Sequence, residues 1–190
     1  MRIVGGRLRG RALVSPADER VRPTSDRVRE SLFNILAHND FGVGFHLDDA
    51  RIIDLFAGTG ALGCEAISRG AKYALFVDAD ADSRALIRQN VEALGLTGAT
   101  KIWKRDATVL GPAPAGSGGP FNLAVIDPPY RKGLVERALA SLRIGNWLAP
   151  GAVVMTECAA DEPAFTLEGF TEFETRIYGE TRVAFLTATP

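Results

Sequence analysis

The feature that most constrains the fold is an alternation of short apolar segments with helical segments from residue 51 onward. Five apolar segments have the length of strands, and stretches with apolar residues at helical spacing lie between them. Strongly apolar strands that alternate with helices form parallel sheets covered on both faces. The expected strands are 51–56, 72–78, 100–105, 121–127 and 151–157, and the expected helices are 60–69, 80–94 and 133–143.

The C-terminal segments follow a different pattern. Residues 170–178 and 181–188 are joined by Gly179 and Glu180, which predicts a closing antiparallel hairpin. Together with the five parallel strands, the hairpin makes a mostly parallel seven-stranded sheet, so the predicted fold class is α/β. The segment 111–120 holds four glycines and three prolines, and we interpret it as a flexible tether rather than a lid.

Length and composition exclude several classes of protein. A chain of 190 residues with 46% hydrophobic and 24% charged residues is typical of one globular domain with at most a small appendage. No apolar run approaches the ~20 residues that span a bilayer, and the first residues lack the apolar core of a secretory signal. Two separate cysteines and two histidines form no disulfide or zinc pattern. We therefore expect a cytoplasmic protein without a membrane segment or a metal site.

The first 40 residues are expected to form an extension of the main domain. Residues 2–4 and 11–14 predict two short strands around a turn at Gly5-Gly6. Ser25 is a suitable N-cap for an amphipathic helix over 25–37. The predicted parts are an N-terminal basic hairpin and helix extension, 1–40, and an α/β domain, 41–190.

Positive charge is concentrated at the N-terminus. The whole chain has a net charge of −1, yet residues 1–30 hold eight arginines against four carboxylates. This asymmetry is typical of an arm that faces a polyanion, although a solvated basic surface has the same pattern. Arg27 and Arg29 are expected on faces of the helix away from its apolar stripe. The arginines expected to face the polyanion are Arg7, Arg9, Arg11, Arg22, Arg27 and Arg29.

A glycine-rich loop follows the first expected strand. Gly58, Gly60 and Gly63 match G-x-G-x-x-G in a strand–loop–helix context, where glycine permits a tight turn and close approach of a cofactor to the backbone. Asp78 ends the next strand, 20 residues after Gly58, where a carboxylate can accept hydrogen bonds from ribose hydroxyls. This set fits a nicotinamide or flavin dinucleotide and S-adenosylmethionine (SAM) equally well.

Two further features favour SAM. Asp54 precedes the glycines, where a carboxylate would repel a pyrophosphate but suits the ammonium and sulfonium charges of SAM. Asp127-Pro128-Pro129-Tyr130 ends the fourth strand and shares the crevice at the carboxyl ends of the strands. Asp127 and the Pro128 carbonyl are expected to accept N–H bonds from the exocyclic amine of a base, on which Tyr130 stacks. A strand-terminating turn with a packed tyrosine is the simpler alternative.

The remaining acidic residues and cysteines are assigned as follows. Asp106 can reach the adenine amino group of SAM or cap residues 107–110, and the cofactor role is favoured. Glu157 is interpreted as a surface carboxylate, and Cys64 and Cys158 as packed small hydrophobes. Because the methyl group of SAM is already activated, the protein has to supply in-line geometry and a desolvated site.

Four motifs spread nearly end to end carry a family resemblance. They are RIVGG at 2–6 with RGR at 9–11, RPTSDRVRESLFN at 22–34, DLFAGTGALG at 54–63 and DPPY at 127–130. They resemble the RsmD family of bacterial SAM-dependent methyltransferases, which modify N2 of a guanine in 16S rRNA, guanine 966. The family often has phenylalanine where this chain has Tyr130, which leaves stacking intact.

The resemblance implies a Rossmann-like class I methyltransferase fold with SAM as the cofactor. It implies 16S rRNA, in the small ribosomal subunit or its assembly intermediate, as the partner. The enzyme is expected to be cytoplasmic and monomeric. The residues implied at the target base are Asp127, Pro128, Pro129 and Tyr130. The residues implied at SAM are Asp54, Ala57, Gly58, Thr59, Gly60, Asp78 and Asp106.

Three other functions remain as alternatives. An adenine-N6 DNA or RNA methyltransferase shares the DPPY motif, but a DNA enzyme usually needs a target-recognition insertion for which 190 residues leave no room. A nicotinamide oxidoreductase leaves Asp54 and the DPPY motif without a role. A non-catalytic ribosome-assembly factor on the same fold does not need the acceptor motif that this chain retains.

Overall fold

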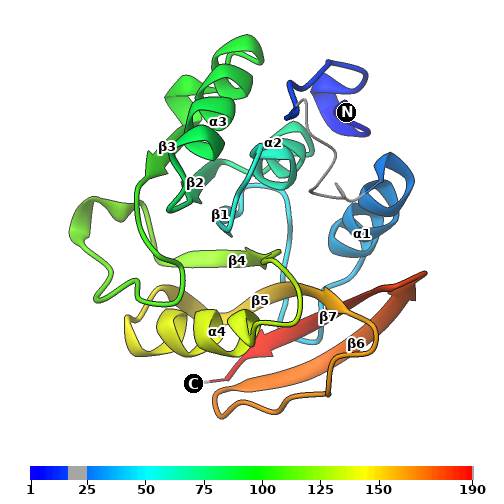
Figure 1. Cartoon of the computed structure of the whole chain (residues 1–190), viewed down its shortest axis with the longest axis vertical. Coiled ribbons are helices and arrows are strands. Elements are labelled where there is room, and N and C mark those ends of the chain that lie inside the picture. Colours follow the sequence, from blue (N-terminus) through cyan, green and yellow to red (C-terminus); the bar gives the residue numbers. More distant parts are fainter. Residues whose placement is uncertain (17–24, 190) are drawn as a thin grey trace.

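The computed structural model describes residues 1–16 and 25–189, and its centre is one seven-stranded sheet (Figure 1). The strand order is β3-β2-β1-β4-β5-β7-β6. Strands β1 to β5 run parallel, whereas β7 is antiparallel to both β5 and β6. The strands are β1 (Arg51–Leu55), β2 (Tyr73–Val77), β3 (Thr100–Trp103), β4 (Phe121–Ile126), β5 (Leu148–Ala159), β6 (Phe170–Tyr178) and β7 (Thr181–Ala188).

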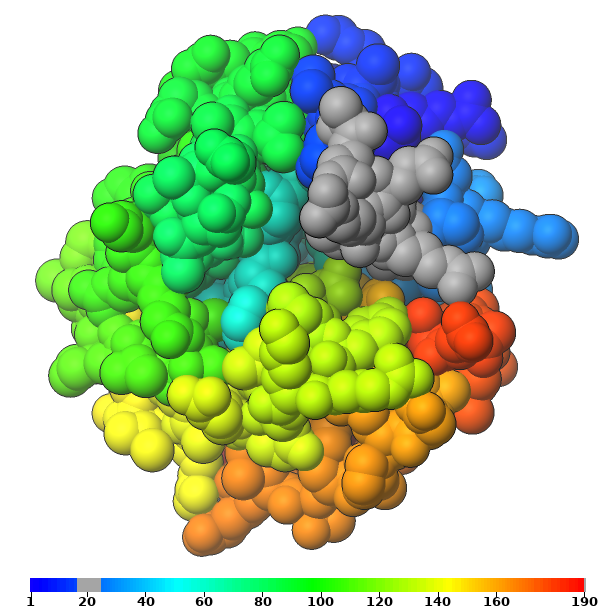
Figure 2. Space-filling view, viewed as in Figure 1, coloured from blue at the N-terminus to red at the C-terminus, as the bar shows by residue number. Residues whose placement is uncertain are grey.

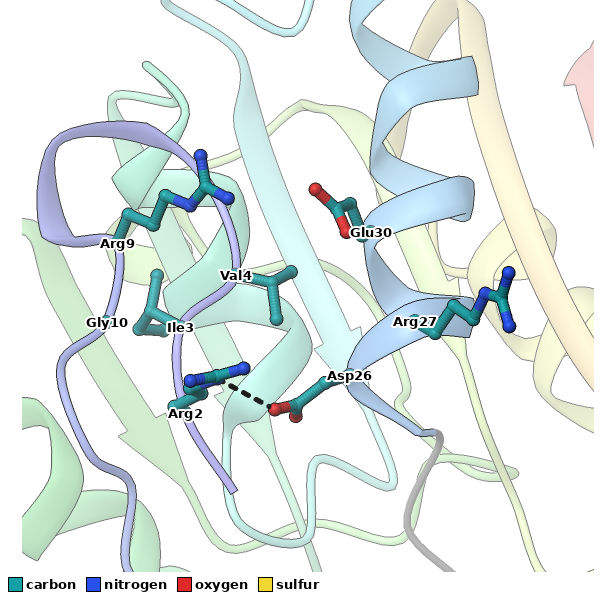
Figure 3. A pocket seen from close by; sticks show the side chains of 8 residues that line it. All are labelled: Arg2, Ile3, Val4, Arg9, Gly10, Asp26, Arg27 and Glu30. Atoms are coloured by element: carbon teal, nitrogen blue, oxygen red, sulfur yellow. Dashed lines mark hydrogen bonds and ion pairs between the residues drawn. The ribbon is translucent and has the colours of Figure 1, made fainter.

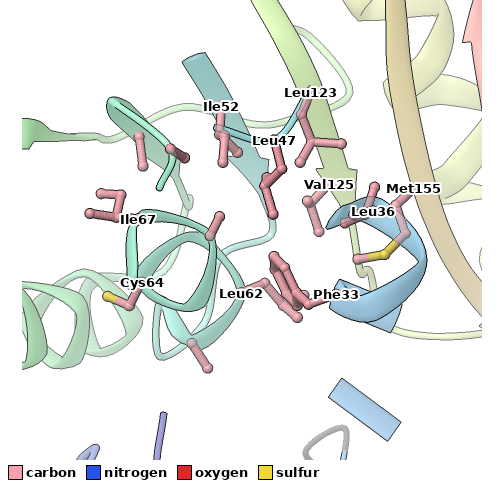
Figure 4. Packing of buried hydrophobic residues seen from close by; sticks show 14 of the residues in the cluster. Phe33, Leu36, Leu47, Ile52, Leu62, Cys64, Ile67, Leu123, Val125 and Met155 are labelled. Carbon is pink, nitrogen blue, oxygen red and sulfur yellow. The ribbon is translucent and has the colours of Figure 1, made fainter. Parts of the chain in front are cut away.

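Helices cover both faces of the sheet, as expected for buried parallel strands. One face packs against α1 (Asp26–His38), α2 (Ala61–Ser68) and α3 (Ala81–Ala93), and the other against α4 (Leu134–Ile144). Figure 4 shows the first layer, in which Phe33 and Leu36 of α1 and Leu62 of α2 lie with Val125 of β4 and Met155 of β5. The predicted α/β class, mostly parallel seven-stranded sheet and C-terminal hairpin are confirmed.

The predicted N-terminal hairpin is reduced to a single bridge between Arg2 and Ala12. A 3-10 turn over Gly6–Leu8 replaces the simple glycine turn. Backbone bonds join the two arms, because Ile3 N donates to the Arg11 carbonyl (2.9 Å) and Leu13 N donates to the Met1 carbonyl (3.0 Å). Helix α2 adds side-chain acceptors, since Val4 N donates to Glu65 Oε2 (2.9 Å) and Leu8 N donates to Ser68 Oγ (2.9 Å). The segment therefore folds back into an antiparallel pair as predicted, but the paired arms form one bridge rather than two regular strands.

The extension shares its core with the main domain. Ile3 and Leu13 of the N-terminal segment and Leu32 of α1 are buried in the same cluster as Ile52 and Phe76 of the sheet. Ser25 caps α1 as predicted, since its Oγ accepts from Val28 N at 3.3 Å. The division at residue 40 remains a prediction about function, because packing joins the two parts into one core.

Arg29 corrects the placement predicted for it. Its side chain is only 1% exposed, so it lies beneath α1 rather than on a polyanion-facing surface. It pairs with Asp26 at 2.7 Å and lies 3.7 Å from Glu65, and it also donates to the Arg2 carbonyl. A guanidinium can be buried when its donors are used by charged and carbonyl partners in this way. Arg22, another predicted polyanion contact, lies outside the described residues.

The glycine- and proline-rich segment 111–120 is anchored at the amino ends of the strands. The Arg51 guanidinium donates to the Gly118 carbonyl, and Tyr73 Oη donates to the Ser117 carbonyl at 3.2 Å. Lys101 Nζ and Trp147 Nε1 add bonds of 2.8 Å to the carbonyls of Gly116 and Gly111. The interpretation as a flexible tether was therefore wrong, and its position is opposite the edge where the glycine loop lies.

We expect Glu65→Ala to destabilise the protein by about 3–5 kcal/mol, because it leaves a buried guanidinium without its buried partner and removes an acceptor for Val4 N. Glu65 is fully buried and also accepts from Arg69 Nε at 2.7 Å. Urea unfolding measures the change. Lys72→Ala, which removes an exposed pair with Asp49 at 3.5 Å, is the control and should change stability by less than about 0.5 kcal/mol. Equal effects of the two substitutions would contradict this role of Glu65.

Candidate active site

The two predicted motifs lie side by side at the carboxyl edge of the sheet. Strands β1 and β4 are neighbours, with Leu55 paired to Ile126, so the glycine loop and Asp127–Tyr130 leave the sheet at the same level. In the space-filling view, the cyan atoms of the loop region lie between green α3 and the yellow-green segment that follows β4 (Figure 2). The crevice at the carboxyl ends of parallel strands is where ligands of such folds bind.

The glycine loop needs glycine for two different reasons. Gly60 precedes α2 with φ +75°, a left-handed conformation that side chains rarely adopt. At Gly63, an added Cβ would come within 2.4 Å of the Phe76 ring, so only glycine lets α2 approach β2 this closely. Phe56 has φ +56° although it is not glycine, and such strain gathers at functional sites.

Asp54 ties the end of β1 to the first turn of α2. Its Oδ2 accepts from Gly63 N at 3.0 Å, and its side chain is 1% exposed. Burial raises the pKa of Asp54 to about 8; the Gly63 bond opposes this rise and the charge of Asp78 adds to it. Its Oδ1 has no hydrogen-bond partner in residues 1–16 and 25–189. A buried acceptor with a raised pKa suits a cationic ligand, which would supply the missing interaction.

Asp78 lies beside the glycine loop as its spacing predicted. Its Oδ2 accepts from Gly58 N at 2.9 Å, and its Oδ1 accepts from Asp80 N at 2.8 Å. The carboxylate is therefore held in a fixed orientation next to the loop backbone. Each oxygen retains a second lone-pair direction with which it can accept from a ligand hydroxyl.

Asp106 caps a turn. Its Oδ1 accepts from Thr108 N at 2.8 Å and from Thr108 Oγ1 at 2.7 Å, and these bonds lower the pKa of the carboxyl group. The side chain is exposed. The capping role is thus observed, while the predicted contact with an adenine amino group stays a prediction that these bonds leave geometrically open through Oδ2.

Ala57 and Thr59 are held in the loop by backbone bonds. Ala57 N donates to the Val77 carbonyl at 3.3 Å, and its carbonyl accepts from Gly60 N at 2.7 Å. The Thr59 carbonyl accepts from Asn90 Nδ2 at 2.9 Å, and Asn90 also bonds both backbone groups of Val14. The N-terminal segment is thereby connected directly to the loop predicted to hold the cofactor.

Asp127 and Tyr130 leave β4 in an acidic environment. The pKa of Asp127 is raised, chiefly because the carboxyl group is removed from water. The negative charges of Glu157 and then Asp54 add to this rise. The Tyr130 hydroxyl donates to Glu157 Oε1 and lies 3.0 Å from Thr181 Oγ1. Burial and the Glu157 bond raise the pKa of the Tyr130 phenol. Pro128 is buried and Pro129 exposed, so the backbone turns at this point between core and solvent.

Glu157 corrects an interpretation made from the sequence. It is not a surface carboxylate, because it is only 7% exposed and contacts Tyr130. The signal that was available is its place at the end of the apolar segment 151–157, next to the strand that ends in DPPY. Cys64 and Cys158 are buried, as predicted for small packed side chains.

The exposed arginines of the extension border a separate hollow of about 310 Å³. It lies between the N-terminal segment and α1, and Figure 3 shows the side chains of Arg2, Arg9 and Arg27 around it, with Asp26 and Glu30 on the helix side. Arg2 is paired with Asp26 at 3.2 Å. Arg7 and Arg11 are also exposed, so four of the six predicted arginines lie on the surface: Arg7, Arg9, Arg11 and Arg27.

The sheet order and the loop at its carboxyl edge define a Rossmann-like fold of the methyltransferase type. The solved structure of yhhF from Escherichia coli superimposes with a TM-score of 0.81 at 29% identity over 100% of this chain and 98% of that one. An RNA methyltransferase from Salinibacter ruber, solved with S-adenosyl-L-homocysteine, shares the fold at a TM-score of 0.63 and 16% identity, over 88% of this chain and 94% of that one.

Sequence comparison gives the family. Residues 1–187 match the family described as Conserved hypothetical protein 95. The chain is 40% identical over 158 residues to ribosomal RNA small subunit methyltransferase D of Escherichia coli, which is 83% of this chain and 74% of that relative. This chain belongs to the RsmD family of methyltransferases, and the predicted resemblance is confirmed. None of the helices in the described ranges is long and apolar enough to cross a membrane.

The raised pKa of Asp54 predicts pH-dependent affinity for SAM, the expected cofactor. A cationic ligand favours the ionised carboxylate, so binding below the pKa of about 8 must release a proton, and affinity falls as the pH decreases from about 8 toward about 6. Asp54→Asn should bind at least about tenfold more weakly than wild type at pH 8 and lose this pH dependence. Isothermal titration in buffers of different protonation enthalpy measures both; wild-type affinity that stays constant over this range would contradict the role.

Proposed function

We propose that this chain transfers a methyl group from SAM to the exocyclic amino group, N2, of a guanine in bacterial small-subunit rRNA. The observation that carries the proposal is the position of Asp127–Tyr130 beside the glycine loop, at neighbouring strand ends. The family supports methyl transfer, and the Escherichia coli relative is named for the small-subunit RNA. The expected target, guanine 966, is part of this proposal.

The loop residues fit SAM as the methyl donor. SAM supplies a methyl group on a positively charged sulfur, and the family and fold support it as the cofactor. Asp54, with its buried Oδ1 not bonded by the described part of the chain, would neutralise the ammonium or sulfonium charge. Asp78 would accept from the ribose, and the backbone of Ala57–Gly60 would lie against the ligand. Asp106 would accept from the adenine amino group through Oδ2.

The DPPY motif fits the acceptor base. An aromatic exocyclic amine is a poor nucleophile because its lone pair is delocalised into the ring. Asp127 and the Pro128 carbonyl would each accept one of its hydrogens, which favours a pyramidal nitrogen and aims the lone pair at the methyl group. Pro129 would keep the turn rigid, because its φ is fixed by the ring. The Tyr130 ring would stack on the base and hold it in line.

The exposed arginines fit the RNA backbone. Arg9 and Arg27 border the hollow beside α1, and Arg7 and Arg11 lie on the same extension. Lys and Arg contacts to phosphates supply sequence-independent affinity and release counterions. A protein with this partner works in the bacterial cytoplasm, and monomer is the proposed state.

We propose guanine rather than adenine as the target base because the sequence motifs resemble the RsmD family, and that resemblance implies N2 of a guanine. A non-catalytic assembly factor would use the arginines but not the acidic site. Both alternatives are outcomes of the experiments below.

We expect Asp127→Ala to lower kcat at least about a hundredfold while changing SAM affinity less than about twofold, because the side chain acts on the acceptor amine. Methyl transfer to small ribosomal subunits and calorimetric SAM binding are measured on the same preparation. Thr156→Val, a buried change in the neighbouring strand β5, is the control and should leave both values close to wild type. Near-normal turnover by Asp127→Ala would overturn the assignment of the acceptor site.

We expect Arg9→Ala and Arg27→Ala each to weaken RNA binding and to reduce the slope of log affinity against log salt by about 1, because each removes a phosphate contact. Binding of small-subunit rRNA is measured from low to moderate salt. Arg143→Ala, an exposed residue of α4 on the opposite face of the sheet, removes the same charge away from the extension and should leave the slope unchanged. A slope that is the same for all three variants would remove the arginines from the RNA interface.

A further inference from the structure

We propose that Glu157 is a positioning residue for methyl transfer, which acts by holding the Tyr130 hydroxyl so that the ring keeps one position beside the target base. This inference rests on the proposed function and deepens it. It assigns a task to a buried carboxylate that the acceptor chemistry itself does not use.

Two strands converge on the tip of Tyr130. Glu157 lies on β5 and Thr181 begins β7, and the antiparallel register pairs Glu157 with Val183 and Ala159 with Thr181. The Tyr130 hydroxyl donates to Glu157 Oε1, and it lies 3.0 Å from Thr181 Oγ1. The ring is thus fixed at its backbone end by the turn after β4 and at its hydroxyl end by the edge of the sheet.

The local backbone explains why a second attachment is useful. Tyr130 is followed by Arg131 with φ +60°, and Pro129 just before it is exposed, so this stretch has left the strand ladder. A ring attached only at Cβ can rotate about two side-chain bonds. Because the hydroxyl oxygen lies on the axis of the second bond, hydrogen bonds there restrict rotation about the first, Cα–Cβ, and so fix where the ring lies before substrate arrives. Displacement of a reacting group by about 1 Å can cost a hundredfold in rate.

The bond is stronger than an ordinary surface contact. Glu157 is 7% exposed, and hydrogen bonds from a hydroxyl to a buried carboxylate are charge-assisted and short. A phenylalanine at position 130 would keep the stacking surface but lose both attachments. The effect of the hydroxyl can therefore be measured separately from the effect of ring stacking.

The test is a double-mutant cycle on initial rates with small ribosomal subunits. Tyr130→Phe and Glu157→Ala should each lower kcat about tenfold, with less than about twofold change in KM for either substrate. Glu157→Gln keeps an acceptor for the hydroxyl and should retain at least about half of wild-type kcat. In the Tyr130→Phe background, Glu157→Ala should have almost no further effect, because its target is already absent. Thr156→Val, next to Glu157 in the strand, is the matched control and should keep wild-type kcat.

A spectroscopic measurement reports the attachment without activity. With 3-fluorotyrosine incorporated, the Tyr130 signal, identified by its loss in Tyr130→Phe, should move in Glu157→Ala and stay in place in Thr156→Val. Multiplicative effects in the cycle, or an unmoved fluorine signal, would overturn the positioning role. A wild-type protein that binds SAM but methylates no RNA would instead overturn the proposed function, while the fluorine signal still decides whether Glu157 holds the ring.

Discussion

The hydrogen bond from Gly63 N to the buried carboxylate of Asp54 is the interaction on which the rest of the site depends. It draws the first turn of α2 against the end of β1, and this approach is possible only because Gly63 has no side chain to meet Phe76. The loop between them is then forced through left-handed conformations at Phe56 and Gly60. Burial disfavours the ionised form of Asp54 and so raises its pKa, and a cationic ligand would stabilise that ionised form.

Negative and positive side chains gather in two different regions, the carboxyl edge of the sheet and the N-terminal extension. Acidic groups gather at the carboxyl edge of the sheet, where burial and the charges of Glu157 and Asp54 raise the pKa of Asp127. Exposed arginines gather on the extension. A net charge of −1 is thus compatible with RNA binding, because the acidic groups are proposed to face SAM and the target base while the arginines face the RNA phosphates. Asn90 bonds both Val14 of the extension and Thr59 of the loop, so the two regions are directly connected.

The sequence predicted what depends on local pattern. Apolar segments, glycine spacing and the Ser25 cap placed nearly every helix and strand and brought the loop and the DPPY motif together. It failed where a partner distant in sequence decides the outcome. Arg29 is buried because Glu65, on another helix, lies beneath it, and Glu157 is buried because Tyr130 reaches it across the strand ends. No periodicity within one segment reveals such contacts. The N-terminal pair is a related case, since its arms bond to each other as predicted while Ser68 and Glu65 of α2 also accept from its backbone.

The most direct test of the proposed reaction identifies the nucleoside that receives the methyl group. The protein is incubated with methyl-labelled SAM and small ribosomal subunits that lack native modification, with free rRNA and DNA in parallel, and the product is digested to nucleosides. We expect label in N2-methylguanosine from the small-subunit RNA. Label in N6-methyladenosine or N6-methyldeoxyadenosine, or no label while SAM is bound, would contradict it.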